Sequence, residues 1–128
     1  MSAGALDGLV VADFSRVLAG PYATMLLADL GAEVVKVERP GTGDDTRAWG
    51  PPWTKQSGGT SAAYFECVNR SKRSVAWDLG DADDRAAALE LIARADVLVE
   101  NFKTGALDRL GLGYAALAEL NPRLIYCS

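Results

Sequence analysis

Two short apolar runs enclose a helical pattern near the start of the chain. Leu9–Phe14 and Val34–Val37 have the length and composition of buried strands. Between them, an apolar stretch begins near Pro21 and ends before Gly31, which predicts a helix because proline fits the first turn and glycine the stop. Ser15–Glu33 is long enough to connect two parallel strands. The pattern therefore predicts a strand–helix–strand unit, and the helix should be buried because it is apolar almost all round.

The remaining chain continues this alternation. Further strands are predicted at Ser74–Leu79, Asp96–Val99 and Leu124–Cys127, and helices at Ser61–Val68, Asp81–Arg94, Gly105–Leu110 and Tyr114–Leu120. Alternating strands and helices indicate an α/β, Rossmann-like fold, with a mostly parallel sheet and helices on both faces. We expect one incomplete domain over residues 1–128, truncated after its fifth strand, because natural domains seldom stop one residue after an apolar strand.

The segment Pro40–Gly59 is rich in glycine and proline. We expect it to be a long loop without secondary structure, and loops of that length are uncommon in compact domains and often functional. Trp49 and Trp53 favour an ordered loop packed over the surface or over a partner, with a flexible excursion as the alternative.

Composition and charge narrow the classes of function. The net charge of −4 argues against a nucleic-acid scaffold, which usually carries a basic excess. The chain has no histidine, which excludes a His-based triad and a His-ligated metal from it. No apolar run approaches the roughly 18 residues of a membrane helix, and the N-terminus has no signal-peptide pattern. Cys67 and Cys127 lack metal or redox spacing, so we expect reduced thiols in a cytoplasmic protein.

Ligands of parallel sheets bind at the carboxyl ends of the strands. The two common nucleotide fingerprints are absent there, since the first loop reads SRVLAG. The start of the first helix nonetheless offers backbone N–H groups to an anion. Arg39 ends the second strand and either contacts a nucleotide or is a surface arginine paired with Glu38 or Asp44. Arg16, in the first loop, is equally ambiguous.

Two later clusters leave similar alternatives. Arg70, Lys72 and Arg73 either hold a phosphate or form a solvated turn. Asn101–Lys103 follows the fourth strand, where its amide, ring and ammonium groups could contact an adenine and a phosphate. Arg109 could face the ligand or the solvent.

Two carboxylates near strand ends, Asp13 and Glu100, could in principle act as nucleophile or base. A structural role is the better interpretation of both. We expect Asp13 to accept hydrogen bonds from loop amides, and Glu100 to fix the loop after the fourth strand. Neither is assigned a catalytic role.

Four longer runs carry a resemblance to a known family. They are DFSRVLAGPYATMLLADLGAEVVKVERPGTGDDTRAWGPP, NRSKRSVAWDL, ADVLVENFKTGALDRLGLGY and LNPRLIYCS. In this order and spacing they resemble the family III CoA-transferases, the CaiB/BaiF group, over essentially the whole chain. GDDTRAWGPP looks most like members that handle dicarboxylates, such as succinate-dependent transferases, and also resembles formyl-CoA:oxalate transferase.

The resemblance implies transfer of CoA between an acyl-CoA and a small carboxylic acid, through an aspartyl anhydride and an aspartyl-CoA thioester. It places the catalytic aspartate beyond Ser128, so no catalytic residue is expected in this chain. It implies CoA or acyl-CoA as substrate, no metal, no nucleic-acid or membrane partner, and an interlocked homodimer for the intact protein. The residues that match the family's CoA contacts are Leu18, Ala19, Arg39, Trp77, Asp78, Leu79, Gly80, Asn101, Phe102, Lys103 and Arg109.

Trp77 and Gly80 depart from the smaller aliphatic residue and the lysine common at those positions. This departure implies a weaker phosphate grip or a different partner for that end of CoA. Two other functions stay open: an α-methylacyl-CoA racemase of the same superfamily, whose bases would also lie downstream, and a free-standing CoA-binding fragment.

Overall fold

A parallel sheet forms the centre of the computed structural model, which describes residues 4–128. Every neighbouring pair of strands is parallel, as the predicted alternation requires. The chain begins in the middle strand, adds two strands on one side and then two on the other, so the strand order reverses beside the middle strand. The carboxyl ends of the strands at such a reversal mark the expected ligand position. The five strands lie in the order β5 (Arg73–Ala76), β2 (Glu33–Glu38), β1 (Val10–Asp13), β6 (Val97–Val99) and β7 (Ile125–Cys127).

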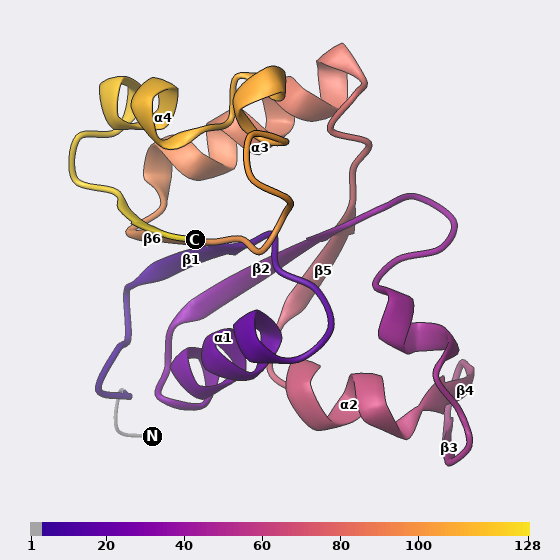
Figure 1. The fold of residues 1–128 in the computed structure, drawn as a ribbon. Helices are drawn as coiled ribbons and strands as arrows, with labels where there is room; N and C mark the ends of the chain where they lie inside the picture. The colour runs from indigo at the N-terminus through magenta and orange to yellow at the C-terminus, as the bar shows by residue number, and fades with distance from the viewer. Residues whose placement is uncertain (1–3) are drawn as a thin grey trace.

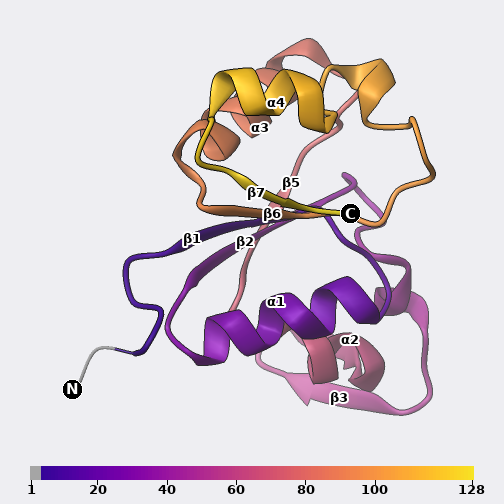
Figure 2. The same cartoon turned by 60° about the vertical axis from the view of Figure 1, so that its left-hand side comes forward.

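Helices cover both faces of this sheet (Figure 1). Figure 2 shows the layers from another side, with α1 and α2 below the sheet and α3 and α4 above it. The predicted α/β, Rossmann-like fold is confirmed. The helices are α1 (Ala19–Asp29), α2 (Ala63–Asn69), α3 (Ala82–Arg94) and α4 (Tyr114–Leu120), with short 3-10 helices η1 (Asp45–Ala48) and η2 (Asp108–Leu110).

Alternating strand residues supply two separate cores, because successive side chains of a strand point to opposite faces. Towards the carboxyl ends of β1 and β2, the face that α1 covers changes from apolar to charged: Asp13, Lys36 and Glu38 are all buried there. The core under α3 and α4 includes Ala12, Phe14, Val35, Val37, Leu91, Ile92, Leu98 and Leu117, and the core under α1 includes Val11, Ala28, Ala32, Val34 and Val99.

The ends of α3 and α1 follow their sequence signals. The Asp81 carboxylate caps α3 by accepting hydrogen bonds from the N–H groups of Asp83 and Asp84, at 2.9 and 3.1 Å. Gly31 follows α1 with φ of +110°, a conformation that glycine adopts without steric cost. Helix α1 begins at Ala19, earlier than expected, and Pro21 lies within its first turn, where a missing N–H costs nothing.

The burial expected for α1 is only half correct. Its buried residues are Pro21, Thr24, Met25 and Ala28. The opposite face carries exposed apolar side chains at every fourth position, and no element of the described residues covers it. Because a single sheet contacts only one face of a helix, an all-round apolar pattern does not ensure burial. The exposed side chains are Leu18, Tyr22, Leu26 and Leu30.

The prediction of a loop without secondary structure over Pro40–Gly59 is wrong. The segment contains η1 and the first strand of a hairpin formed by β3 (Trp53–Gln56) and β4 (Gly59–Ala62). The Ser-Gly-Gly run after Gln56 is a hairpin signal that the composition concealed. The two tryptophans are about half exposed, at 47% for Trp49 and 50% for Trp53, and Trp49 packs edge-on against Tyr64 with ring centroids 5.3 Å apart.

Smaller boundary shifts have local causes. The third strand of the main sheet ends at Ala76, before the expected Leu79, because its pairing with β2 stops at Glu38. The helix expected from Ser61 begins at Ala63, since Ser61 pairs within the hairpin. Only the last turn of the helix expected at Gly105–Leu110 forms, as η2.

Two general expectations can be compared with the described residues. None of the helices in residues 4–128 has the length and apolarity needed to cross a membrane. Cys67 and Cys127 are exposed and are not paired with each other, as expected for free thiols.

Candidate functional site

The loops after β1 and β6 meet at the point where the strand order reverses. The Asn101 side chain joins them: its oxygen accepts the Arg16 N–H at 2.9 Å, and its amide nitrogen donates to the Arg16 carbonyl at 2.8 Å. Glu100 accepts the Phe102 N–H at 2.8 Å, which confirms its expected role in the loop after β6. Side chains that bond to backbone groups therefore fix these two loops. Both polar atoms of the Asn101 side chain are used in its hydrogen bonds to Arg16.

Asp13, at the end of β1, is the most heavily bonded carboxylate of this edge. It is fully buried and accepts hydrogen bonds from the Ser15 N–H at 3.0 Å, the Ser15 hydroxyl at 2.5 Å and the Thr24 hydroxyl at 2.6 Å. Lys72 completes the set with an ion pair of 3.0 Å. The predicted acceptance of loop amides is confirmed, and Asp13 also joins β1 to α1 and to the turn before β5.

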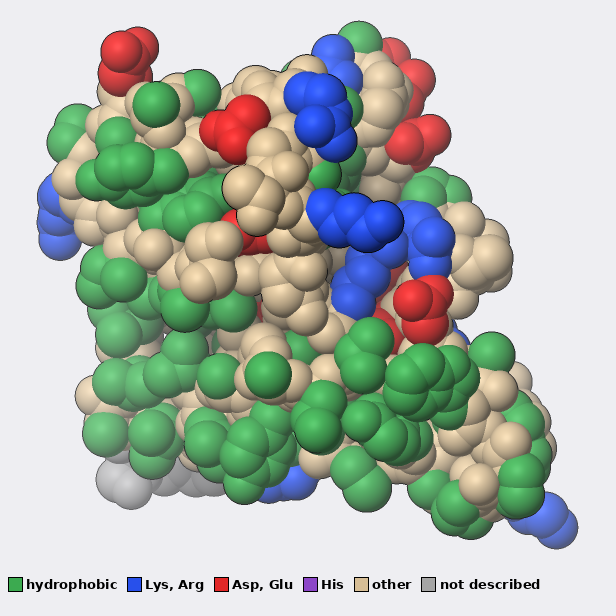
Figure 3. All heavy atoms as spheres, viewed as in Figure 1, with side chains coloured by type: hydrophobic (Ala, Val, Ile, Leu, Met, Phe, Trp, Pro, Cys, Tyr) green, Lys and Arg blue, Asp and Glu red, His purple; other side chains and the backbone are tan. Residues whose placement is uncertain are grey.

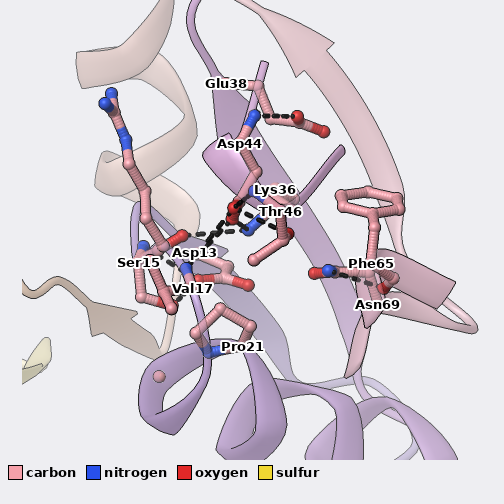
Figure 4. Close-up of polar contacts among 12 residues, drawn as sticks. Asp13, Ser15, Val17, Pro21, Lys36, Glu38, Asp44, Thr46, Phe65 and Asn69 are labelled. Atoms are coloured by element: carbon pink, nitrogen blue, oxygen red, sulfur yellow. Dashed lines mark hydrogen bonds and ion pairs between the residues drawn. The ribbon is translucent and has the colours of Figure 1, made fainter. Parts of the chain in front are cut away.

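A second buried ion pair joins Lys36 of β2 to Asp44, at 2.9 Å (Figure 4). The ammonium also donates to the Ser15 carbonyl at 2.9 Å. Asp44 caps η1 through the Thr46 N–H and hydroxyl, at 3.0 and 2.8 Å. Its oxygens lie 3.3 and 3.4 Å from the N–H of Val17, whose φ of +72° is unusual for a β-branched residue. Lys36 of β2 and its partner Asp44 thus fix the loop after β1 through its backbone at Ser15 and Val17.

Glu38 lies two positions after Lys36 on β2, on the same face of the strand, and it extends this network of buried charges. Its carboxylate accepts a bidentate pair from Arg47, 2.7 Å at each contact, and single bonds from the Ser74 hydroxyl and the Asp44 N–H, each 2.7 Å. Burial by itself raises the pKa of Glu38, but the hydrogen bonds from Arg47, Ser74 and Asp44 outweigh it and lower that pKa. The same opposition, with donors Thr46 and Lys36, lowers the pKa of Asp44.

Acid is expected to destabilise the fold through these two carboxyls. A group whose pKa is lower in the folded state stabilises fully above its ordinary pKa, here 4.5 for Glu38 and 3.8 for Asp44, and the stabilisation is lost as pH falls through the folded-state pKa. The free energy of unfolding, measured with urea, should therefore decline below about pH 4.5. A Glu38→Gln variant should be less stable at pH 7 and decline less steeply. Parallel curves for the two proteins would remove Glu38 from this explanation.

On the other face of the sheet, the same edge is hollowed into a cavity of about 260 Å³. Trp77, Leu79 and Phe102 give it an apolar surface, and the arginines Arg16 and Arg39 bring charge to its rim. Basic side chains gather on this side of the molecule with acidic ones beside them (Figure 3). A site with aromatic walls and guanidinium groups suits a nucleotide, because rings stack on a base and guanidinium forks bind phosphate.

The two arginines at the rim are held differently. Arg39 pairs with Asp45 at 2.5 Å, with both side chains about half exposed. The alternative of a surface pairing with Glu38 or Asp44 is therefore wrong in its partner, since Arg47 and Lys36 pair with those carboxylates. Arg16 lies over the Phe102 ring, with its guanidinium carbon 5.1 Å from the ring centroid.

The structure brings together six of the predicted site residues and leaves five outside the cavity. Asn101 bonds to the first loop, Lys103 lines a neighbouring hollow near Tyr126, and Arg109 is exposed on η2. Leu18 and Ala19 are exposed at the start of α1. The residues that line the cavity are Arg39, Trp77, Asp78, Leu79, Gly80 and Phe102.

The solvated turn predicted for the basic cluster at the start of β5 is correct for Arg70 and Arg73, which are exposed, and wrong for Lys72, whose side chain is buried. Arg70 pairs with Asp29 at 2.7 Å, and Arg73 pairs weakly with Glu33 at 3.4 Å. Lys72 is buried against Asp13, and its desolvation lowers its pKa. All three cations are therefore partnered within the chain.

Three residues of this edge were missed or left undecided by the sequence. Lys36 was not singled out, and its partner Asp44 was considered only as a partner for Arg39, although a lysine within an otherwise apolar central strand signals a buried partner. Arg16 was left ambiguous, and the structure places it in the cavity. Among the described residues, no group of three or more His, Cys, Asp or Glu side chains is arranged to hold a metal ion.

Comparison with known proteins identifies what this arrangement is similar to. A family model described as CoA-transferase family III matches residues 6–128. The chain is 52% identical to the succinyl-CoA:glutarate CoA-transferase of Homo sapiens, over 96% of the chain and 27% of that protein. It is 56% identical to the succinyl-CoA:mesaconate CoA-transferase of Haloarcula hispanica, over 98% of the chain and 31% of that protein. The chain thus spans about three tenths of the length of these relatives.

A solved structure shows the same fold at high similarity. The chain matches a CaiB/BaiF family protein from Brucella suis with a TM-score of 0.95 and 51% sequence identity, over 99% of the chain and 33% of that protein. Strand order, helix placement and the first loop therefore belong to an arrangement already seen in a longer protein.

Proposed function

The chain belongs to CoA-transferase family III, and we propose that residues 1–128 form the N-terminal CoA-binding Rossmann-like domain of a CoA-transferase. The observation that supports this most directly is the cavity at the carboxyl edge of the sheet. It combines Trp77 and Phe102 with Arg39, and it lies beside the strand-order reversal where nucleotides bind in doubly wound sheets.

The charge distribution supports a binding role for this chain. The buried carboxylates Asp13, Glu38 and Asp44 each accept several hydrogen bonds and pair with a cation. A nucleophile must be free to attack, so none of these three groups suits covalent catalysis. The chemical step, formation of an aspartyl anhydride and then an aspartyl-CoA thioester, is assigned to an aspartate expected beyond residue 128.

We propose that the acid that accepts CoA is a short dicarboxylic acid, and that the donor is the CoA thioester of another. The relatives described above carry names that include glutarate and mesaconate, and both are dicarboxylates. Transferase names among these relatives favour transfer over the racemase alternative. The interlocked homodimer and the cytoplasmic location remain proposals for the intact protein, and sedimentation of that protein would test the first.

Calorimetric titration of the chain with CoA tests the binding role. We expect saturable binding at one site and no acyl exchange between succinyl-CoA and glutarate. Arg39→Ala should weaken CoA binding about tenfold or more, since a hydrogen bond to a charged group contributes about 1.5–3 kcal/mol. In the intact enzyme it should change the chemical step less than the affinity for CoA.

The matched control is Arg73→Ala, which removes an exposed arginine that pairs with Glu33 away from the cavity. It should leave CoA affinity unchanged. Equal affinities of the wild type and Arg39→Ala would show that the assignment at Arg39 is wrong. Acyl exchange by the 128-residue chain would refute the placement of the nucleophile elsewhere.

A further inference from the structure

Arg16 is an exception among the cations at the carboxyl edge. Lys36, Lys72, Arg39 and Arg47 each form an ion pair with a carboxylate. Among the described residues, the Arg16 guanidinium forms no ion pair, although the side chain is half buried. A half-buried guanidinium without an anion has lost hydration that no partner within the chain replaces.

The position of Arg16 is nevertheless well defined. Its N–H and carbonyl are both bonded to the Asn101 side chain, at 2.9 and 2.8 Å. Its guanidinium lies 5.1 Å from the centroid of the Phe102 ring. Backbone anchors and a ring contact fix the direction of the side chain without using its hydrogen-bond donors on a carboxylate. Those donors are available to a ligand.

Arg16 and Arg39 line the same cavity, and their like charges repel each other. Burial, followed by the charge of Arg39, lowers the pKa of Arg16, and the more distant carboxylates of Asp45, Asp44 and Glu38 oppose this only in part. The carboxylate of Asp45 is committed to Arg39 at 2.5 Å. Asp78, also in the lining, uses its carboxylate to accept the Gly80 N–H at 2.9 Å. An anion that reaches both guanidinium groups would replace this repulsion by attraction.

We propose that Arg16 and Arg39 jointly bind one phosphate group of the CoA nucleotide, and that Arg16 determines how strongly the phosphate contributes to binding. This inference rests on the proposed function. A phosphate presents several acceptor oxygens and matches two guanidinium forks. Trp77 and Leu79 provide the adjoining apolar surface for the base. Both the 3′-phosphate and the 5′-diphosphate of CoA have this chemistry.

Titration of the wild type and Arg16→Gln with CoA is the first experiment. Arg16→Gln should weaken CoA binding about tenfold, and Arg39→Gln by a similar factor. The double variant should lose less than the product of the two factors, because both guanidinium groups act on one phosphate. Circular dichroism and thermal unfolding should show that each variant stays folded.

Titration with 3′-dephospho-CoA distinguishes the two phosphate sources. If the 3′-phosphate is bound, Arg16→Gln should weaken CoA binding and leave dephospho-CoA binding unchanged. If the diphosphate is bound, the variant should weaken both ligands by the same factor. Pantetheine, which has no phosphate, should bind the wild type and the variant equally.

Asp45→Asn gives a change in the opposite direction. It removes the carboxylate that competes with phosphate for Arg39, so CoA should bind severalfold more tightly. Asp29→Asn is the matched control, since it removes a carboxylate from the distant pair with Arg70, and it should leave CoA affinity unchanged. Weaker or unchanged binding by Asp45→Asn contradicts the competition.

Two results would separate this inference from the proposed function. If the wild type binds CoA and Arg16→Gln binds it equally well, the phosphate role of Arg16 is refuted while the CoA-binding role stands. If the folded wild type does not bind CoA, the CoA-binding role of the chain and the phosphate role of Arg16 are both refuted.

Discussion

Lys36→Met is expected to lower the free energy of unfolding by about 3–5 kcal/mol, because removing one partner leaves the other charge buried and unpaired. The Lys36 and Asp44 side chains are 1% and 0% exposed, so water cannot replace the missing ammonium. The Ser15 carbonyl also loses its donor. Methionine has nearly the shape of the lysine stem, so little of the effect should come from a cavity. Urea unfolding at pH 7 measures the change.

Arg73→Gln is the control for this prediction. It removes the cation of an ion pair in which the side chains are 78% and 39% exposed, and exposed pairs contribute about 0–1 kcal/mol. The contrast between the two variants isolates burial as the cause. Should Lys36→Met cost no more than Arg73→Gln, the buried pair would have no special role in stability.

Asp13→Asn is expected to destabilise by a similar amount, about 3–5 kcal/mol, because it removes the charge that compensates buried Lys72. The new amide also places two N–H donors among groups that already donate, the Ser15 N–H and the Thr24 hydroxyl. Thermal unfolding should shift to lower temperature, and proteolysis should first cleave near Ser15. Asp29→Asn, at an exposed pair, should change stability by well under 1 kcal/mol.

A double-mutant cycle sharpens this second prediction. Lys72→Met removes the buried cation, and in the Asp13→Asn background it should cost much less than in the wild type, because no charge is left to compensate. Additive effects would show that Asp13 and Lys72 act independently, contrary to their 3.0 Å contact.

Both predictions concern function as well as stability, because the same network shapes the first loop. Lys36 and Asp13 bond to Ser15, and Asp44 lies against the N–H of Val17. Val17 keeps a left-handed φ of +72°, which a β-branched residue adopts only when its surroundings enforce it. Arg16 directly precedes Val17. Loss of the network should therefore weaken CoA binding even in variants that remain folded.

Much of the fold could be predicted from the chain by itself. The order of strands and helices, the cap at Asp81 and the stop at Gly31 all depend on residues close together in sequence. The placement of Arg39 and Phe102 at one edge also followed, because the carboxyl ends of parallel strands meet there. The β3–β4 hairpin was missed because glycine and proline content was taken to exclude strands.

The tertiary structure alone decided which distant polar groups meet. Asp13 and Lys72 are 59 positions apart, and Arg16 and Asn101 are 85 apart. Glu38 and Asp44 are nearer to Arg39 in sequence than Asp45 is, and only the path of the chain into η1 selects Asp45. The exposure of one face of α1 could not be predicted from the sequence either. An apolar pattern shows that a helix face favours burial, but it does not show whether another element covers that face. The local sequence pattern thus determined the helices and strands. Which ion pairs form between distant segments required the folded chain, because a charged side chain pairs with whichever opposite charge the backbone brings within reach.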